Sequence, residues 1–349
     1  MEMQLRIPML DLIIIIIYLV GITTVGILVT QKQRVTANTF FLAGRSLRWG
    51  MIGAALFASN ISTIHLVGLA ASGYNEGLVW GNFEWIAIFA LILLALIFSP
   101  LYIKSKISTL PEFLEKRYSS ASRTFVAFMA LAAALFIHIG MSLYAGAAVF
   151  QQFFGIDVFV SIFVISLMTL LYTVLGGLRA VVVTETIQSG ILVLGAITVT
   201  LCALWALPEH GIHTVAEFKS SLRPNQLSMF HMDSSVGLSW YAILLGCPVL
   251  AIWYWCTDQT IVQRVLAARS ERDAQLGPLF AGCLKILPVF FMVFPGVVGY
   301  VLFKDVIGSD SNQTLPVLIN ELVPTGLRGL ISAGILAALM STIAAALNS

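Results

Sequence analysis

The chain has 349 residues, of which 59% are apolar and 10% are charged, and its formal net charge is +2. A soluble domain carries about 25% charged residues, and charged side chains are rarely buried unless they are paired. The composition therefore excludes an ordinary soluble enzyme and a disordered chain, and the small net charge gives no footprint for a nucleic acid. It indicates an integral membrane protein.

Nine stretches of the sequence are long and apolar enough to cross a membrane. A helix needs about 20 mostly apolar residues to span the hydrocarbon core. The stretches, numbered as spans one to nine, are residues 9–29, 49–73, 81–103, 125–150, 158–175, 181–207, 238–259, 277–303 and 327–347. The first is longer than the apolar core of a signal peptide and no A-x-A site follows it, so we expect it to remain as a membrane helix.

Basic residues gather in alternate loops between these spans. Thirteen of the 19 Lys and Arg residues follow spans one, three, five and seven. They are Lys32, Arg34, Arg45, Arg48, Lys104, Lys106, Lys116, Arg117, Arg123, Arg179, Arg264, Arg269 and Arg272. By the positive-inside rule, this pattern predicts a multi-pass protein of a cell membrane with its N-terminus outside and residue 349 at the cytoplasmic side.

Spans two and seven are not plain apolar helices. Span two carries the polar run 58–65 near mid-membrane, and span seven carries Pro248 followed by the polar and aromatic run 253–259. Proline removes a backbone donor, so we expect a kink at Pro248. Non-helical backbone at membrane depth is tolerated only where it is buried or lines a wet cavity.

The two unusual spans lie five apart, which favours an all-α transporter built from inverted five-helix repeats. On this interpretation, a single transporter domain comprises an extra helix at residues 9–29, a first repeat at 49–207 and a partial second repeat at 238–349.

Ionisable side chains inside spans cost at least about 2.5–3.5 kcal/mol at the bilayer centre, so each is a functional candidate. Glu84, near the outer end of span three, fits either an interfacial acid or a functional residue. Lys285 lies deeper, in span eight, where snorkelling along its own stem competes with a functional role. His65 follows the polar turn of span two and can donate or accept at neutral pH. His138 in span four fits either a satisfied core histidine or a functional group.

Three further features admit both a structural and a functional interpretation. Glu185 falls near the start of span six, where an acid complements the helix dipole. Ser341 and Thr342 in span nine either bond to the carbonyl four residues earlier or, together with carbonyls freed by an unwound helix, supply oxygens for a hard cation such as Na⁺. The aromatic run 253–255 fits an interfacial belt or a platform for the apolar face of a sugar.

Several segments, in order along nearly the whole chain, carry a family resemblance. They are Phe41-Leu42-Ala43-Gly44-Arg45-Ser46, Phe57-Ala58-Ser59-Asn60-Ile61-Ser62 with His65 and Gly68, Gly81-Asn82-Phe83-Glu84-Trp85, Thr109-Leu110-Pro111-Glu112-Phe113-Leu114, Gly176-Gly177-Leu178-Arg179-Ala180, 253–259, Ile261-Val262-Gln263-Arg264, Lys285 with Pro288, and Ser341-Thr342 with Asn348-Ser349. With these segments the chain resembles the sodium:solute symporter family, and within it the sodium/glucose cotransporter branch. The resemblance implies sodium-driven symport by alternating access on the LeuT-type inverted-repeat fold, with Na⁺ as coupling ion, no other cofactor and no enzymatic activity.

The resemblance also implies positions for two binding sites. The implied solute site consists of Asn60, His65, Phe83, Glu84, Tyr254, Trp255 and Lys285, with Tyr254 as an inner gate. The implied Na⁺ site consists of the carbonyls of Ala58, Ile61 and Ala338 and the hydroxyls of Ser341 and Thr342. Glu185 and His138 stand where relatives carry other polar or charged groups, and they are candidate coupling residues. The implied partners are a small solute, such as a sugar, Na⁺ and the lipid bilayer, with no nucleic acid.

The family needs two more helices than the nine spans to complete its second repeat, so we expect the chain to be the N-terminal part of a transporter. Symport of a glucose- or galactose-like sugar is the leading prediction. A sodium symporter for another organic solute, such as an inositol, a sialic-acid-like sugar or a carboxylate, is the alternative within transport. A solute sensor or non-transporting remnant of the same fold is the alternative outside it.

Overall fold

The computed structural model describes residues 8–30, 36–232 and 238–349. In these residues the regular structure is helical, apart from one isolated parallel bridge between Leu47 and Ala268. The α-helices are α1 (Met9–Leu28), α2 (Ala37–Leu42), α3 (Trp49–Asn60), α4 (Thr63–Asn75), α5 (Gly81–Leu93), α6 (Ser99–Lys104), α7 (Leu110–Arg117), α8 (Ser120–Ala132), α9 (Ser142–Phe154), α10 (Val158–Ala206), α11 (Val215–Ser220), α12 (Cys247–Ile252), α13 (Gln259–Leu266), α14 (Glu271–Leu284), α15 (Phe294–Ile307), α16 (Thr314–Leu322) and α17 (Leu327–Asn348).

Shorter segments of tighter or wider helix join several of these elements. The 3₁₀ segments are η1 (Ala43–Arg45), η2 (Leu78–Trp80), η5 (Pro208–His210) and η9 (Ser311–Gln313). The π-helical segments are η3 (Leu94–Phe98), η4 (Ala133–Met141), η6 (Ala242–Gly246), η7 (Trp253–Thr257) and η8 (Val289–Val293). Because π-helical turns within α-helices are frequent at functional sites, the position of η7 is of particular interest below.

In the described residues, six helices are long and apolar enough to cross a membrane, and the bent pair of α3 and α4 makes a seventh. Two of the nine expected spans, five and six, lie in the one run that contains α10, which breaks at Gly177 with φ 58° and ψ −161°. Expected span seven corresponds to the shorter apolar run Ala242–Thr257. The multi-pass character is therefore confirmed, and the count of nine stays a prediction.

The expected interruption of span two is confirmed. Helix α3 ends at Asn60, α4 begins at Thr63, and the two halves are bent by 63°. Ile61 and Ser62 between them are extended, with ψ of 107° and 172°. The Ser62 hydroxyl caps α4 by accepting a hydrogen bond from the His65 amide at 3.4 Å. This N-cap satisfies one of the amides that the break would leave unpaired.

Span seven leaves helical geometry near its C-terminal end, and the kink expected at Pro248 stays a prediction. The backbone before Pro248 stays helical, with Gly246 at φ −87° and ψ −53°, because the π-helical segment η6 precedes the proline. The chain leaves helical geometry at Asp258, which has ψ 128° and whose carboxylate caps α13 by accepting from the Thr260 amide at 2.8 Å. The interruption of this span therefore lies at Asp258.

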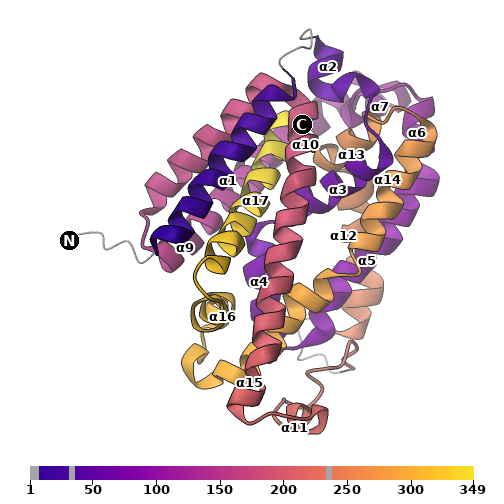
Figure 1. Cartoon of the computed structure of the whole chain (residues 1–349). Helices are drawn as coiled ribbons and strands as arrows, with labels where there is room; N and C mark the ends of the chain where they lie inside the picture. The colour runs from indigo at the N-terminus through magenta and orange to yellow at the C-terminus, as the bar shows by residue number, and fades with distance from the viewer. Residues whose placement is uncertain (1–7, 31–35, 233–237) are drawn as a thin grey trace.

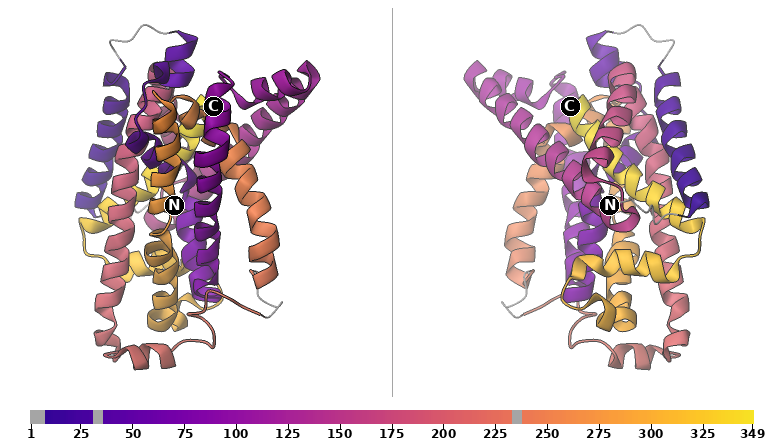
Figure 2. Two further views of the ribbon diagram at one scale, coloured as in Figure 1. Left: turned by 90° about the vertical axis from the view of Figure 1, so that its right-hand side faces the viewer. Right: turned by 90° about the vertical axis from the view of Figure 1, so that its left-hand side faces the viewer.

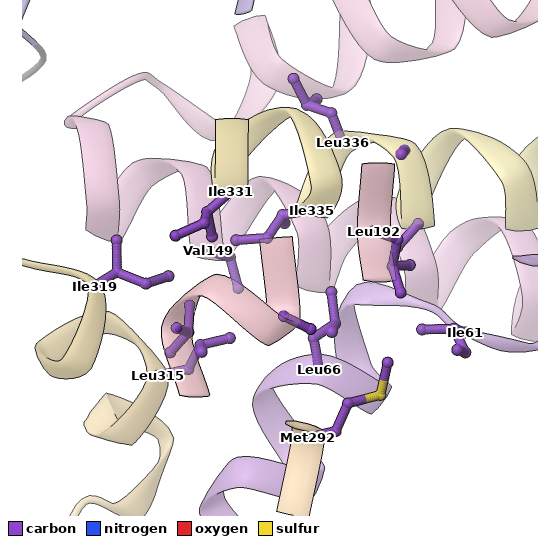
Figure 3. Packing of buried hydrophobic residues seen from close by; sticks show 14 of the residues in the cluster. Ile61, Leu66, Val149, Leu192, Met292, Leu315, Ile319, Ile331, Ile335 and Leu336 are labelled. Carbon is purple, nitrogen blue, oxygen red and sulfur yellow. The ribbon is translucent and has the colours of Figure 1, made fainter. Parts of the chain in front are cut away.

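Helix α17 forms the centre of the molecule. It lies between α1 and α10 (Figure 1), and 89% of its most apolar 18-residue window is buried. Its apolar side chains meet those of α4, α9, α10 and α16, where Leu66, Val149, Leu192, Ile331 and Ile335 converge (Figure 3). By contrast, α8 has no buried residue, and the helices around it lean away from the bundle in both views of Figure 2.

Helices α4 and α15 approach closely because both present a glycine at their contact. A Cβ atom built on Gly296 would overlap the Ala70 carbonyl, and one built on Gly73 would overlap the Val293 carbonyl. Small residues permit such close helix packing in membrane proteins.

We predict that Gly296→Ala lowers the stability of the detergent-solubilised protein, because the new methyl group meets backbone that cannot turn aside. The expected loss is about 1–3 kcal/mol, which is typical of overpacking. Gly21→Ala is the matched control, since no atom lies within 4 Å of a Cβ atom at that position. Thermal unfolding of both variants measures the difference. Equal midpoints would contradict the close contact of α4 and α15.

Candidate functional site

A cavity of about 390 Å³ lies beside the break between α3 and α4. Pockets that hold small molecules commonly have about 300–1,000 Å³. The seven residues expected to form a solute site all line this cavity. They are Asn60 at the end of α3, His65 in α4, Phe83 and Glu84 in the first turn of α5, Tyr254 and Trp255 in η7, and Lys285 directly after α14. Residues from five separate stretches of sequence are thus brought to one wall.

A buried ion pair lies at the core of this wall. The Lys285 Nζ atom is 2.6 Å from Glu84 Oε2, and each side chain is 1% exposed. Lys285 also donates a hydrogen bond to the Asn60 side-chain oxygen, and its ammonium lies 5.6 Å from the centre of the Trp255 ring. Because Lys285 immediately follows α14, its charge also complements the C-terminal end of that helix. Both side chains are therefore paired inside the protein, and neither extends to the membrane surface.

His65 completes the polar network. Its Nε2 atom is 3.7 Å from Glu84 Oε1, and its Nδ1 atom is 3.5 Å from the Ser62 hydroxyl. The position of the ring follows from the N-cap, because Ser62 holds both the backbone amide and the side chain of His65. Glu84 thus has a basic group beside each of its oxygens, and the remaining edges of the network face the cavity.

Aromatic side chains form the other part of the wall. The rings of Tyr254 and Trp255 meet edge to face, with centroids 5.2 Å apart. Trp255 is buried, Tyr254 is partly buried, and Phe83 is 37% exposed. The π-helical segment that carries Tyr254 and Trp255 is tied to α6, because the Tyr102 hydroxyl donates to the Cys256 carbonyl at 2.8 Å. The wall therefore offers both aromatic surface and hydrogen-bonding groups.

Four of the five residues expected to bind Na⁺ lie together next to the cavity. The Ser341 hydroxyl is 3.0 Å from the Ala58 carbonyl and 2.9 Å from the Ala338 carbonyl. The Thr342 hydroxyl is 3.0 Å from the same Ala338 carbonyl, and Thr342 also lines the cavity. Ile61 is buried at the end of α3, and in the described residues it shares no hydrogen bond with the other four. We call Ala58, Ala338, Ser341 and Thr342 the oxygen cluster.

The two candidate coupling residues each face a side chain from a distant part of the sequence, Arg264 in the case of Glu185 and Asp258 in the case of His138. Glu185 accepts a hydrogen bond from Arg264 Nε at 3.1 Å and a second from the Arg264 Nη2 atom, and both side chains are fully buried. Glu185 lies within α10, so it is paired across the protein rather than placed to complement a helix terminus. His138 Nε2 lies 3.9 Å from Asp258 Oδ2, at the edge of the cavity.

Sequence reasoning missed Arg264 and Asp258 as parts of this region. Arg264 was expected to be a loop cation, yet it is 0% exposed and also donates to the Thr260 carbonyl. The sequence signal was weak. Residues 261–267 around Arg264 are mostly apolar, which is unusual for a solvated loop, and Asp258 stands where an N-cap of the following helix belongs.

Comparisons with known proteins identify the family of the chain. The model of the sodium:solute symporter family matches residues 40–349. Sodium/glucose cotransporter 1 of Ovis aries is 34% identical over an alignment of 373 residues in length, which covers 97% of this chain and 56% of that protein. Sodium/myo-inositol cotransporter 2 of Homo sapiens is 36% identical over 368 residues, which cover 97% of this chain and 54% of that protein. This chain therefore spans about half the length of these relatives.

A solved structure gives the same result for the fold. The substrate-bound, outward-open state of a Na⁺-coupled sialic acid symporter has a TM-score of 0.87 and 25% identity, and the match covers 98% of this chain and 72% of that chain. The expected all-helical, LeuT-type transporter fold is thereby confirmed. The match to the family model, the sequence identity to these relatives and the shared fold together show that the chain belongs to the sodium:solute symporter family.

Proposed function

We propose that this chain provides the solute and sodium sites of a sodium-coupled symporter for a neutral, polyhydroxylated ring, such as glucose or galactose, which it moves by alternating access. The observation that carries the proposal is the network of Lys285, Glu84, Asn60 and His65 on a cavity wall that also presents Tyr254 and Trp255. Hydroxyl groups both donate and accept hydrogen bonds, so they fit a wall that offers donors and acceptors side by side.

The charges in the cavity favour a neutral solute over a carboxylate. In the described residues that line it, Lys285 is paired with Glu84, and the two histidines each face an acid, His65 facing Glu84 and His138 facing Asp258. A solute carboxylate would have to compete with a buried protein carboxylate for its cation, and breaking a buried pair costs several kcal/mol. A neutral solute can bond to the same groups while leaving each pair intact.

The aromatic part of the wall supports a ring-shaped solute. Tyr254 and Trp255 offer apolar faces on which the C–H face of a sugar ring can lie, and we propose that Tyr254 is also the inner gate. A cyclic polyol such as myo-inositol has the same hydroxyl chemistry. It is the second candidate because two matched proteins of similar identity are named as glucose and myo-inositol cotransporters.

We propose that the oxygen cluster, with the Ile61 carbonyl, binds the coupling Na⁺. The support is that the hydroxyls of Ser341 and Thr342 lie within 3.0 Å of the carbonyl oxygens of the cluster, beside the end of α3. The last carbonyls of a helix have no backbone amide from a following turn to bond to, so they are free to face a cation. The same break carries Asn60 on the solute side. Filling one site therefore biases the geometry of the other, and such coupling is reciprocal.

We further propose the division into an extra helix at 9–29, a first repeat at 49–207 and a partial second repeat at 238–349, with the N-terminus outside and residue 349 at the cytoplasmic side. The support for the repeats is that the first spans of both, two and seven, are interrupted, and that residues beside both interruptions line the cavity. The orientation rests on the distribution of basic residues along the sequence.

The first prediction from the proposed function concerns the solute site. Lys285→Ala should weaken sodium-dependent binding of glucose or galactose at least about tenfold, because it removes charge-assisted hydrogen bonds and leaves Glu84 unpaired. Equilibrium binding of labelled sugar to the purified protein measures the loss. Lys104→Ala is the matched control, since that side chain is 71% exposed. Unlabelled myo-inositol should compete and a sialic acid should not. Full sugar affinity in Lys285→Ala would rule out this site.

The second prediction concerns sodium. Ser341→Ala should raise the Na⁺ concentration that gives half of the sodium-dependent increase in thermal stability, by about tenfold for a ligand interaction worth about 1.4 kcal/mol. Ser332→Ala is the matched control on the same helix, because its hydroxyl bonds to the Arg328 carbonyl away from the oxygen cluster. Equal effects of the two substitutions would remove Ser341 from the sodium site.

We propose that Glu185 and His138 couple sodium binding to movement of α13, because each is paired with a residue on or beside that helix. The support is the buried Glu185–Arg264 pair and the His138–Asp258 contact at the start of α13. Both pairs join α13 to elements of the first proposed repeat, α10 and η4.

The third prediction tests this coupling. Arg264→Met should destabilise the protein by about 3–5 kcal/mol because Glu185 is left buried without its partner, and adding Glu185→Gln should restore most of that loss. The control is the exposed Arg123–Glu115 pair, where Arg123→Met should lower the stability by less than about 1 kcal/mol.

The test of coupling itself is transport by the double variant Arg264→Met/Glu185→Gln. Its ratio of Na⁺ to solute taken up should fall. An unchanged ratio would restrict the pair to a structural role.

A further inference from the structure

The segment 223–229, which we call the strap, crosses the ends of α4 and α5 and contains one deeply buried polar side chain. Gln226 is 2% exposed, whereas Pro224 and Asn225 beside it are exposed. Its side-chain amide donates to the Tyr74 carbonyl at 3.1 Å and to the Gly73 carbonyl at 3.4 Å. Both carbonyls belong to the last turn of α4. The Gly73 carbonyl also receives the Gly77 amide at 3.1 Å, so it is the Tyr74 carbonyl for which Gln226 supplies the donor that the helix end lacks.

The backbone of the strap is held just as closely. The Leu78 amide donates to the Gln226 carbonyl at 2.9 Å. Gly77, at the turn between α4 and η2, has φ +86°, and a Cβ atom there would overlap the Gln226 carbonyl. Only a glycine combines this backbone conformation with such an approach. The turn after α4 is therefore shaped to receive the strap.

The far end of the strap is bonded to the start of α5. Asn82, which is 7% exposed, donates to the Met229 carbonyl at 2.5 Å and to the Val79 carbonyl at 2.9 Å. The next two residues after Asn82 are Phe83 and Glu84, which line the cavity. A bond to the strap thus lies two residues before Glu84, which meets Lys285 and His65.

The other end of the strap is attached to α15. The Arg223 guanidinium stacks on the Tyr300 ring at 4.3 Å and donates to the Asn75 carbonyl at 2.9 Å. These contacts place the strap on the group formed by α4, α5 and α15. The same group carries His65 and Glu84.

We propose that Gln226 and Asn82 are positioning residues: through the strap they hold α4 and α5 in the arrangement in which Glu84 meets both Lys285 and His65, and so set solute affinity without touching the solute. This inference rests on the proposed function only in that one of its tests measures solute binding. Its physical basis is independent of the solute, because a first helical turn fixed at Asn82 leaves Glu84 little freedom to leave its partners.

The test compares Gln226→Ala and Asn82→Ala with Asn225→Gly. The control alters the neighbouring exposed amide while tolerating the left-handed backbone at Asn225, φ 64°. We expect the sugar concentration for half-saturation to rise about five- to tenfold in the first two variants, as for loss of a buried hydrogen bond. Sodium affinity, measured without sugar, should change less than about twofold, because the oxygen cluster lies on α3 and α17. Equal losses of sugar and sodium affinity would indicate general destabilisation and overturn the proposal.

A second perturbation keeps every hydrogen-bonding side chain. Gly77→Ala should displace the strap and raise the half-saturating sugar concentration as Gln226→Ala does. The double variant Gly77→Ala/Gln226→Ala should be little worse than either single one, because both act through the same strap. Additive effects would contradict a shared mechanism.

Hydrogen exchange separates this inference from the proposed function. Amides of residues 78–86 should exchange faster in Gln226→Ala than in Asn225→Gly, whether or not a sugar binds. Unchanged exchange would overturn the strap as a positioning device. If the unmodified chain bound no glucose, galactose or myo-inositol, the proposed function would fail, and the exchange measurement would still decide the role of the strap.

Discussion

Inside a bilayer the protein itself must supply partners for backbone groups, and this constraint governs both interruptions of the helices. At the end of α3 the Ala58 carbonyl receives a hydrogen bond from Ser341 of α17, and the Ser62 hydroxyl holds the next helix. At the end of η7 the Cys256 carbonyl receives one from Tyr102, and Asp258 caps α13. Each break is thus surrounded by oxygen and hydroxyl groups, and this is why we propose the cation and solute sites beside them.

Two buried ion pairs and one histidine–carboxylate contact lie around these breaks, and each joins elements distant in sequence. Lys285 meets Glu84 across 201 residues, Arg264 meets Glu185 across 79, and His138 faces Asp258. A buried pair adds little net stability over an apolar pair, but separating its members is costly. The pairs therefore act mainly to select one relative arrangement of α5, α10, α13 and α14. Two of the three lie on the cavity, where a change of arrangement would alter the site.

In our proposal the strap adds a second way of fixing the cavity wall that carries Glu84. Lys285 holds Glu84 from the side of α14, and Asn82 holds the first turn of α5 from the side of the strap. The proposed sodium cluster shares the interrupted span with Asn60 but has no bond to the strap in the described part of the chain. On the proposed assignment of the two sites, we therefore expect solute and ion affinities to be perturbed separately, although they would remain thermodynamically linked through α3 and α4.

Composition and periodicity by themselves determined that the chain crosses a membrane in helices and that span two is interrupted, because these are local properties of apolar runs and polar residues. The cost of burying charge also marked Glu84 and Lys285 as candidates. Only the tertiary structure decided that Glu84 and Lys285 are partners, that Arg264 is fully buried rather than in a solvated loop, and that span seven leaves helical geometry at Asp258. Pairing and burial depend on which distant elements come into contact, and the local sequence around a residue does not show which elements those are.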